Sequence, residues 1–276
     1  MGKSSMYSSS KIIAVLPISR TRYIDRVLNS LKSQTLKPDI LCVIVDKKID
    51  PAEDKRLKEL LDKLTMRVVI GESPNEQVGS GIEERRQNIS NLHNSFQDLI
   101  GHAMYGLSPE EFFKYRWVFS LEDDGILPPY AIERLHKIAE KNDAGLVSGV
   151  ELGRWGLPYV GAWEADNCES PQRVTSLKSK TSSVDEIDAS GLYCALVRLH
   201  SYVKHQFHCD NGLGPDVNLG LFLRDKGFKN YIDWSVKVTH LTRDFDGEKE
   251  IPADSEAHQV ELFKNGSEWS YKVLQE

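Results

Sequence analysis

The sequence predicts an α/β fold in which a mainly parallel central sheet is flanked by helices. Short apolar, β-branched runs alternate with amphipathic segments from about residue 11 to residue 152. Strands that alternate with helices imply right-handed crossovers and therefore parallel pairing. The apolar runs lack the polar–apolar alternation of a half-exposed strand, so both faces of the sheet should be covered.

Strands and helices follow one another in strict order through this first part. The apolar runs predict strands at 11–18, 40–46, 66–71, 115–121 and 144–152. Apolar residues at helical spacing predict helices at 22–34, 51–64, 82–101 and 128–141. Proline in the first turn marks the starts of the helices at 51 and 128. Gly101 is expected to end the helix at 82–101.

The regular alternation of strands and helices ends after residue 152, where we expect an added antiparallel region. Residues 153–184 are rich in Gly, Ser and Lys and are interpreted as loop. Further along, the patterns predict a long strand at 184–199 with Gly191 near its centre, a helix at 215–228, a strand at 229–241 and a short helix near 255–264.

These elements favour a single domain over residues 11–243. We divide it into a first half, 11–124, and a second half, 125–243. Residues 1–10 are expected to be a disordered lead-in, and 244–276 a polar, acidic tail.

Composition narrows the functional classes. The chain has 276 residues and a net charge of −6, so no strong field attracts nucleic acid, although a local basic patch stays open. No apolar run approaches the roughly 20 residues that span a bilayer, and the N-terminus lacks a secretory pattern. Four cysteines without C-x-x-C spacing fit a reduced, cytoplasmic protein. The oligomeric state is left open.

Acidic residues follow two of the predicted strands. Asp46 ends the second strand, and Glu122, Asp123 and Asp124 end the fourth. Carboxyl ends of parallel strands face one crevice, where ligands bind. Hard divalent cations take carboxylate oxygens, so we predict a cation site there. In an extended stretch Glu122 and Asp124 would share a face, with Asp123 turned away. The alternative is a solvated turn.

Five segments in order resemble the GT-A fold, inverting family 2 glycosyltransferases. They are "IIAVLPISR", "LCVIVDKK", "WVFSLEDDGILPPYAIERL", "IDASGLYCALVRLHSY" and "GPDVNLGLFLRDKGFKNYIDWSVKVTHL". The third resembles the family's Asp-x-Asp (DXD) segment, with Glu122 in place of the first Asp, and the last resembles the stretch that holds the catalytic acid and a closing His.

The resemblance implies a metal-dependent, inverting transfer of a sugar from a nucleotide-sugar donor to a hydroxyl acceptor. The implied general base is Asp216, and the implied ligands of Mn²⁺ or Mg²⁺ are Glu122, Asp124 and His240. The implied donor contacts are Pro17, Ser19, Asp46, Arg86 and Asp123, and the expected donor is a UDP-sugar. Tyr159, Trp163 and Trp155 are candidate stacking residues for sugar or base.

Each assignment has a structural alternative. Asp216 begins a helix, where an acid also serves as a cap. Arg86 lies in "EERR", which also fits a surface charge network. His240 also fits a structural role at a strand end, and Asp46 an ordinary turn.

Two other functions compete with the transferase. A nucleotidyltransferase usually has a glycine-rich loop after its first strand, but residues 17–20, Pro-Ile-Ser-Arg, contain no glycine. A non-catalytic nucleotide-sugar-binding module is the other alternative. The acceptor stays open among polysaccharide, lipid, protein and a modified DNA base, and the acidic charge does not favour DNA.

Overall fold

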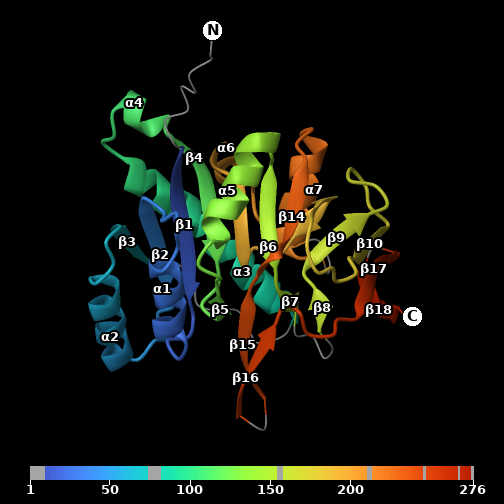
Figure 1. Cartoon of the computed structure of the whole chain (residues 1–276), viewed down its shortest axis with the longest axis horizontal. Coiled ribbons are helices and arrows are strands. Elements are labelled where there is room, and N and C mark those ends of the chain that lie inside the picture. The colour runs from blue at the N-terminus through green and yellow to red at the C-terminus, as the bar shows by residue number, and fades with distance from the viewer. Residues whose placement is uncertain are drawn as a thin grey trace.

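The computed structural model describes residues 10–73, 82–153, 158–209, 213–244, 247–266 and 268–274. It has the predicted class: a mixed α/β, Rossmann-like fold with a large, mainly parallel central sheet flanked by helices (Figure 1). Smaller antiparallel sheets are added to it. Except for Ser10, the predicted lead-in lies outside the described residues; the Ser10 hydroxyl donates to Glu140 and contacts His136.

The central sheet joins segments from most of the chain. Its order is β11 (Val184–Ile187), β14 (Asn230–Lys237), β6 (Leu146–Val150), β13 (Cys194–Arg198), β4 (Tyr115–Leu121), β1 (Lys11–Ile18), β2 (Ile40–Val45) and β3 (Arg67–Glu72). Strands β4, β1, β2 and β3 pair in parallel, as do β6 and β14. Strands β13 and β11 run antiparallel to their neighbours. The carboxyl ends of the parallel strands therefore share one edge.

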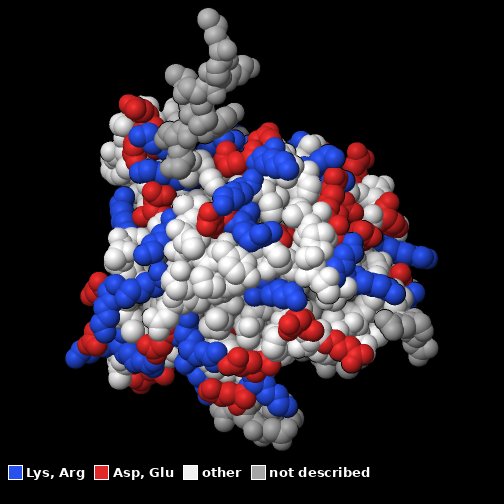
Figure 2. All heavy atoms as spheres, viewed as in Figure 1, with Lys and Arg blue, Asp and Glu red and all other residues white. Residues whose placement is uncertain are grey.

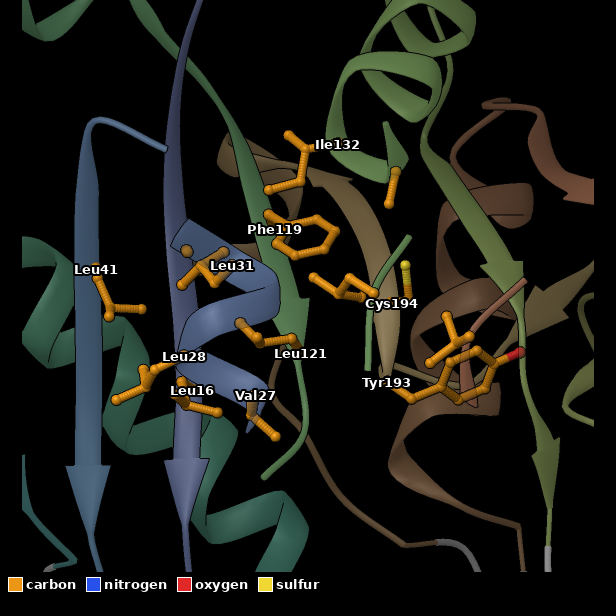
Figure 3. Close-up of a cluster of buried hydrophobic side chains, with 14 of the residues drawn as sticks. Leu16, Val27, Leu28, Leu31, Leu41, Phe119, Leu121, Ile132, Tyr193 and Cys194 are labelled. Carbon is orange, nitrogen blue, oxygen red and sulfur yellow. The ribbon is translucent and has the colours of Figure 1, made fainter. Parts of the chain in front are cut away.

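Helices cover both faces of the sheet. They are α1 (Ile24–Lys32), α2 (Pro51–Leu61), α3 (Ile82–Met104), α4 (Pro109–Phe112), α5 (Ala131–Asn142), α6 (Leu199–Lys204) and α7 (Pro215–Asp225). Helices α1, α2 and α5 pack on one face, where Leu31 and Ile132 lie near Phe119 (Figure 3). On the other face, α3, α6 and α7 bury Phe96, Tyr202 and other apolar side chains.

The third helix is longer than predicted. It continues through Gly101 and ends at Met104, and Gly106 follows with φ +81°. Buried Ile100 and Ala103 hold this last turn against the sheet, which outweighs the low helix propensity of glycine. The glycine that breaks the chain here is Gly106, because its left-handed conformation suits a residue without Cβ.

The predicted strand at 184–199 is wrong as one element. It is three strands, because β12 (Ala189–Ser190) pairs with a different sheet from β11 and β13. The break lies at Gly191, where a Cβ would come within 2.4 Å of the Tyr193 ring. Close packing of that ring therefore requires glycine.

The segments interpreted as loop and helix are also partly strand. Residues 153–184 contain β8 (Tyr159–Val160), β9 (Ala162–Ala165) and β10 (Arg173–Ser176). The expected helix near 255–264 is instead β17 (Gln259–Asn265), which pairs with β10 and β18 (Glu268–Leu274). The pairing of β10 with β17 joins segments far apart in the sequence, which local pattern does not reveal, and it places both in one antiparallel sheet.

Two further antiparallel sheets, one of three strands and one of two, lie beside the central sheet. Strand β15 (Thr239–Asp244) pairs with β5 (Gly125–Ile126) and β16 (Gly247–Pro252), and this hairpin projects at the lower edge in Figure 1. Strand β7 (Leu152–Gly153) pairs with β8. No described helix is both long enough and apolar enough to cross a membrane. Acidic and basic side chains are interspersed over the face shown in Figure 2.

His93 predicts a specific sensitivity to acid. It is buried between α3 and α6, with Nδ1 2.7 Å from the Tyr202 hydroxyl, and burial lowers its pKa to about 3. Below pH 6.5 the His93 side chain is protonated in the unfolded chain but stays neutral in the folded chain. The free energy of unfolding therefore decreases as the pH falls from about 6.5 towards 3. In wild type this proton makes the unfolding constant rise up to about tenfold for each pH unit of acidification. His93→Gln should remove that part of the rise.

Urea unfolding at a series of pH values measures this slope. His200→Gln is the control, because His200 is an exposed residue of α6. If His93→Gln and wild type showed the same slope between pH 6 and pH 4, His93 would titrate normally in the folded protein.

Candidate functional site

Residues from three parallel strands meet at the carboxyl edge of the sheet. Ser19 follows β1, Asp46 follows β2, and the acidic triplet follows β4. A small pocket at this edge brings Ser19 and Asp46 together with Asn88 and Asn91 of α3. Asp46 also accepts a hydrogen bond from the backbone of Lys48 at 3.0 Å, as a turn residue does. Pro17 lies within β1, in register with Ile44.

Asp123 ties the end of β4 to the loop after β1. Its Oδ2 accepts hydrogen bonds from the Ser19 backbone (2.8 Å), the Ser19 hydroxyl (3.0 Å) and the Arg20 backbone (2.8 Å). Its Oδ1 accepts from Nη2 of Arg20 at 2.8 Å. The side chain is almost fully buried. The prediction that Asp123 turns away from Asp124 is wrong, because residues 123–124 form a turn and both carboxylates contact Arg20.

Asp124 is fully buried and faces two cationic side chains. Its Oδ2 accepts a hydrogen bond from Nη2 of Arg20 at 2.7 Å and lies 3.4 Å from Nε2 of His240. The antiparallel pairing of β15 with β5 sets this contact, because His240 is in register with Gly125. Asp124 and His240, predicted from separate segments, are therefore neighbours.

His240 is held by groups on both ring nitrogens. Nδ1 lies 2.9 Å from the carbonyl oxygen of Leu152 and 3.1 Å from Oε1 of Glu151, which is also buried. Burial by itself would lower the pKa of His240, but the carboxylates of Asp124 and Glu151 outweigh it and raise the pKa to about 9. At neutral pH the ring is therefore an imidazolium between two carboxylates.

Asp216 is half-buried in the first turn of α7. Burial raises the pKa of its carboxyl, whereas the backbone N–H of Val217 and the charge of Arg86 act in the opposite direction. The N-cap of α7 is Gly214 and makes no side-chain cap hydrogen bond, so Asp216 lies inside the first turn, where a carboxylate is favoured by the helix dipole. A raised pKa also suits a group that takes up a proton.

Tyr159 connects the two parts of the site. Burial raises the pKa of its hydroxyl, and the charges of Asp216, Arg86 and Glu122 act on it in turn. Glu122 is partly exposed. Charged groups after β4 and on α3 and α7 therefore lie within electrostatic range of Tyr159 on β8. Trp163 packs against Tyr159 with a ring separation of 5.6 Å, whereas Trp155 lies outside the described residues.

Tyr193 and Gly191 lie close to Asp216 in the fold. The Tyr193 hydroxyl donates to the carbonyl oxygen of Gly161 at 3.2 Å, and its ring packs on Gly191. A Cβ at Gly191 would lie 3.6 Å from Oδ2 of Asp216. Gly191 therefore lies between the Tyr193 ring and the carboxylate of Asp216.

Some of these side chains could bind a divalent cation. Within the described ranges, no group of three or more His, Cys, Asp or Glu side chains is arranged to hold a metal. The pair Asp124 and His240 does fit: neighbouring ligands of an octahedral cation with bonds of about 2.1 Å are about 3 Å apart, close to the observed 3.4 Å. Such a cation would take its other ligands from water and phosphate. Arg20 would have to leave Asp124, and His240 would have to lose its proton.

Sequence reasoning missed three residues of this site. Arg20 and Glu151 each contact a predicted residue, and the ring of Tyr193 packs against Gly191. Arg20 directly follows the predicted Ser19, which is a usable signal. Glu151 and Tyr193 gave none, because only the fold brings them to this edge.

A larger hollow lies on another face of α7. Its volume is about 730 Å³, and its lining includes Leu213, Asn218 and Asp225 of the α7 region together with His205 and Trp269. At 100° per residue, Asn218 and Asp225 lie on the opposite side of α7 from Asp216. The hollow is therefore separate from the site at the carboxyl edge.

Comparisons with known proteins give little further information. No known protein family matches the sequence, and no curated protein sequence is similar to it. The crystal structure of A197 from STIV is similar, with 12% sequence identity and a TM-score of 0.49, and the match covers 90% of this chain and 96% of that chain.

The Asp123 contacts predict a stability effect. Asp123→Asn replaces one acceptor oxygen with an amide that faces hydrogen-bond donors, so we expect a loss of about 3 kcal/mol in the free energy of unfolding. Asp46→Asn is the matched control, since Asp46 is partly exposed at the end of the neighbouring strand, and it should cost less than about 1 kcal/mol. Urea denaturation measures both. Equal losses would show that the Asp123 carboxylate does not tie the edge together.

Proposed function

We propose that this chain is a GT-A-type glycosyltransferase that moves a sugar from a nucleotide-sugar donor to a hydroxyl acceptor with inversion. The proposal is carried by the buried acidic cluster at the carboxyl edge together with a half-buried acid, Asp216, whose pKa is raised. The charges of Asp216 and Glu122 both raise the pKa of the Tyr159 hydroxyl. Metal-activated donors and hydroxyl acceptors require this combination of groups.

Asp216 would act as the general base. Its carboxylate takes the proton of the acceptor hydroxyl as that oxygen attacks the anomeric carbon from the face opposite the leaving group. The bond from the anomeric carbon to the diphosphate oxygen breaks, and its electron pair leaves with the nucleotide diphosphate. The partial burial of Asp216 makes it a stronger proton acceptor than a solvated aspartate.

Basic groups would balance the charge that builds on the leaving diphosphate. Arg86 lies near Asp216 and Tyr159 and is itself only 13% exposed. A divalent cation, Mn²⁺ or Mg²⁺, stays a prediction; it would be held by Asp124 and His240 and would supply Lewis-acid stabilisation of the phosphate oxygens. Ser19 and Asp46 line the neighbouring pocket, where we expect the nucleoside.

A panel of nucleotide sugars, with and without Mn²⁺, tests the donor assignment by thermal shift. We expect one nucleotide sugar, a UDP-sugar in the first instance, to raise the melting temperature, because binding to the folded state alone stabilises it. Stabilisation by nucleoside triphosphates alone would instead favour a nucleotidyltransferase. Indifference to every nucleotide and nucleotide sugar would contradict the proposal.

Asp216→Asn separates the base from the helix cap. The amide cannot take up the proton, so transfer should fall by about 10²–10⁴-fold, whereas the donor should bind as before. Asp225→Asn, at the exposed far end of the same helix, is the matched control and should transfer at the wild-type rate. Product formation and donor thermal shifts are measured for both variants. If Asp216→Asn instead kept full activity and lost stability, Asp216 would be only a cap.

A further inference from the structure

Arg20 occupies the position between the two buried carboxylates of the acidic triplet. Its Nη2 donates one hydrogen to Oδ1 of Asp123 at 2.8 Å and one to Oδ2 of Asp124 at 2.7 Å. The two carboxylates are at most 4% exposed, whereas the Arg20 side chain is 45% exposed. Arg20 therefore connects the buried acids to solvent.

Arg20 differs from the other arginines of its segment. Arg22 and Arg26 pair with Glu248 and Glu250, which are more than half exposed, so these are surface ion pairs of small energetic weight. Arg20 binds buried carboxylates, and its contacts are charge-assisted and sheltered from water. Of its five N–H hydrogens, Nη2 uses two, and those on Nη1 and Nε have no acceptor among the described residues.

The carboxylates that Arg20 contacts belong to an acidic cluster. Asp123, Asp124 and Glu151 are buried carboxylates, and Arg20 and the ring of His240 lie against them. Carboxylate oxygens are ligands that a hard divalent cation prefers, but the Asp124 oxygen that would bind it already accepts from Arg20.

We propose that Arg20 and a divalent cation exchange at Asp124, and that the displaced guanidinium then binds the diphosphate of the donor. The inference rests on the proposed function. Arg20 keeps its bond to Asp123 and gives up its contact with Asp124, so the guanidinium stays at the carboxyl edge. An exposed guanidinium with open N–H groups is suited to phosphate oxygens.

The exchange couples the two ligands. The cation by itself must compete with Arg20 and binds weakly. With diphosphate present, Arg20 has a new partner, so the loss of its contact with Asp124 is compensated. Arg20→Met should therefore change the two affinities in opposite directions. It should strengthen binding of the bare cation and weaken binding of the cation–diphosphate complex. A charge-assisted hydrogen bond corresponds to about 10–100-fold in each direction.

The experiment measures two affinities of the full chain. Binding of Mn²⁺ alone is followed by the loss of the free-ion EPR signal, and binding of a preformed manganese–pyrophosphate complex by calorimetry. We expect Arg20→Met to bind Mn²⁺ at least about tenfold more tightly than wild type and the complex at least about tenfold more weakly. Arg22→Met, which removes the same charge two residues away, should change neither affinity more than about threefold.

A second variant covers a failure to fold. Arg20→Lys keeps the charge, but one ammonium cannot reproduce the bridge between Asp123 and Asp124, so the same opposite shifts should appear with smaller factors. The proposal is overturned if neither variant binds Mn²⁺ more tightly than wild type, or if Arg22→Met matches Arg20→Met. If both variants bind Mn²⁺ more tightly as expected but no nucleotide sugar stabilises the chain, the exchange at Asp124 is supported and the transferase function is contradicted.

Discussion

The carboxylate of Asp123 is the contact on which the whole carboxyl edge depends. It accepts four hydrogen bonds from Ser19 and Arg20 and so fixes the loop after β1 against the end of β4. A buried charge is tolerated only when its hydrogen bonds are complete, so these contacts hold the loop in one place. Arg20 is thereby positioned to reach Asp124.

The second half of the chain reaches the same place by a different route. The pairing of β15 with β5 is short, but the Leu241 backbone also donates to the carbonyl oxygen of Asp124 at 2.7 Å. Backbone contacts therefore set His240 beside Asp124 before any side chain is considered. Because a slip of one residue would turn His240 to the other face, the register itself is a functional constraint. Glu151 then fixes the ring from the other side.

The sequence was sufficient for elements whose signal is local. Strands β1 and β4 match the predicted bounds, and the acids after β2 and β4 lie at one edge, because parallel pairing requires it. The signal fails where stability comes from distant partners, as in β17 and in the broken segment around Gly191. The same limit explains the site. Glu151 looks like an ordinary residue between two apolar runs until β15 brings His240 to it.

Charge balance links this architecture to its chemistry. Three buried carboxylates lie at the edge against Arg20 and the ring of His240, and Glu122 adds a partly exposed acid. In the proposed reaction these carboxylates would repel the diphosphate of the donor, and Arg86, the open side of Arg20 and a divalent cation would oppose that repulsion. The same acids that hold the loop in place would then also set the charge of the ligands bound there, so structural and chemical roles are not separable at Asp123 and Asp124.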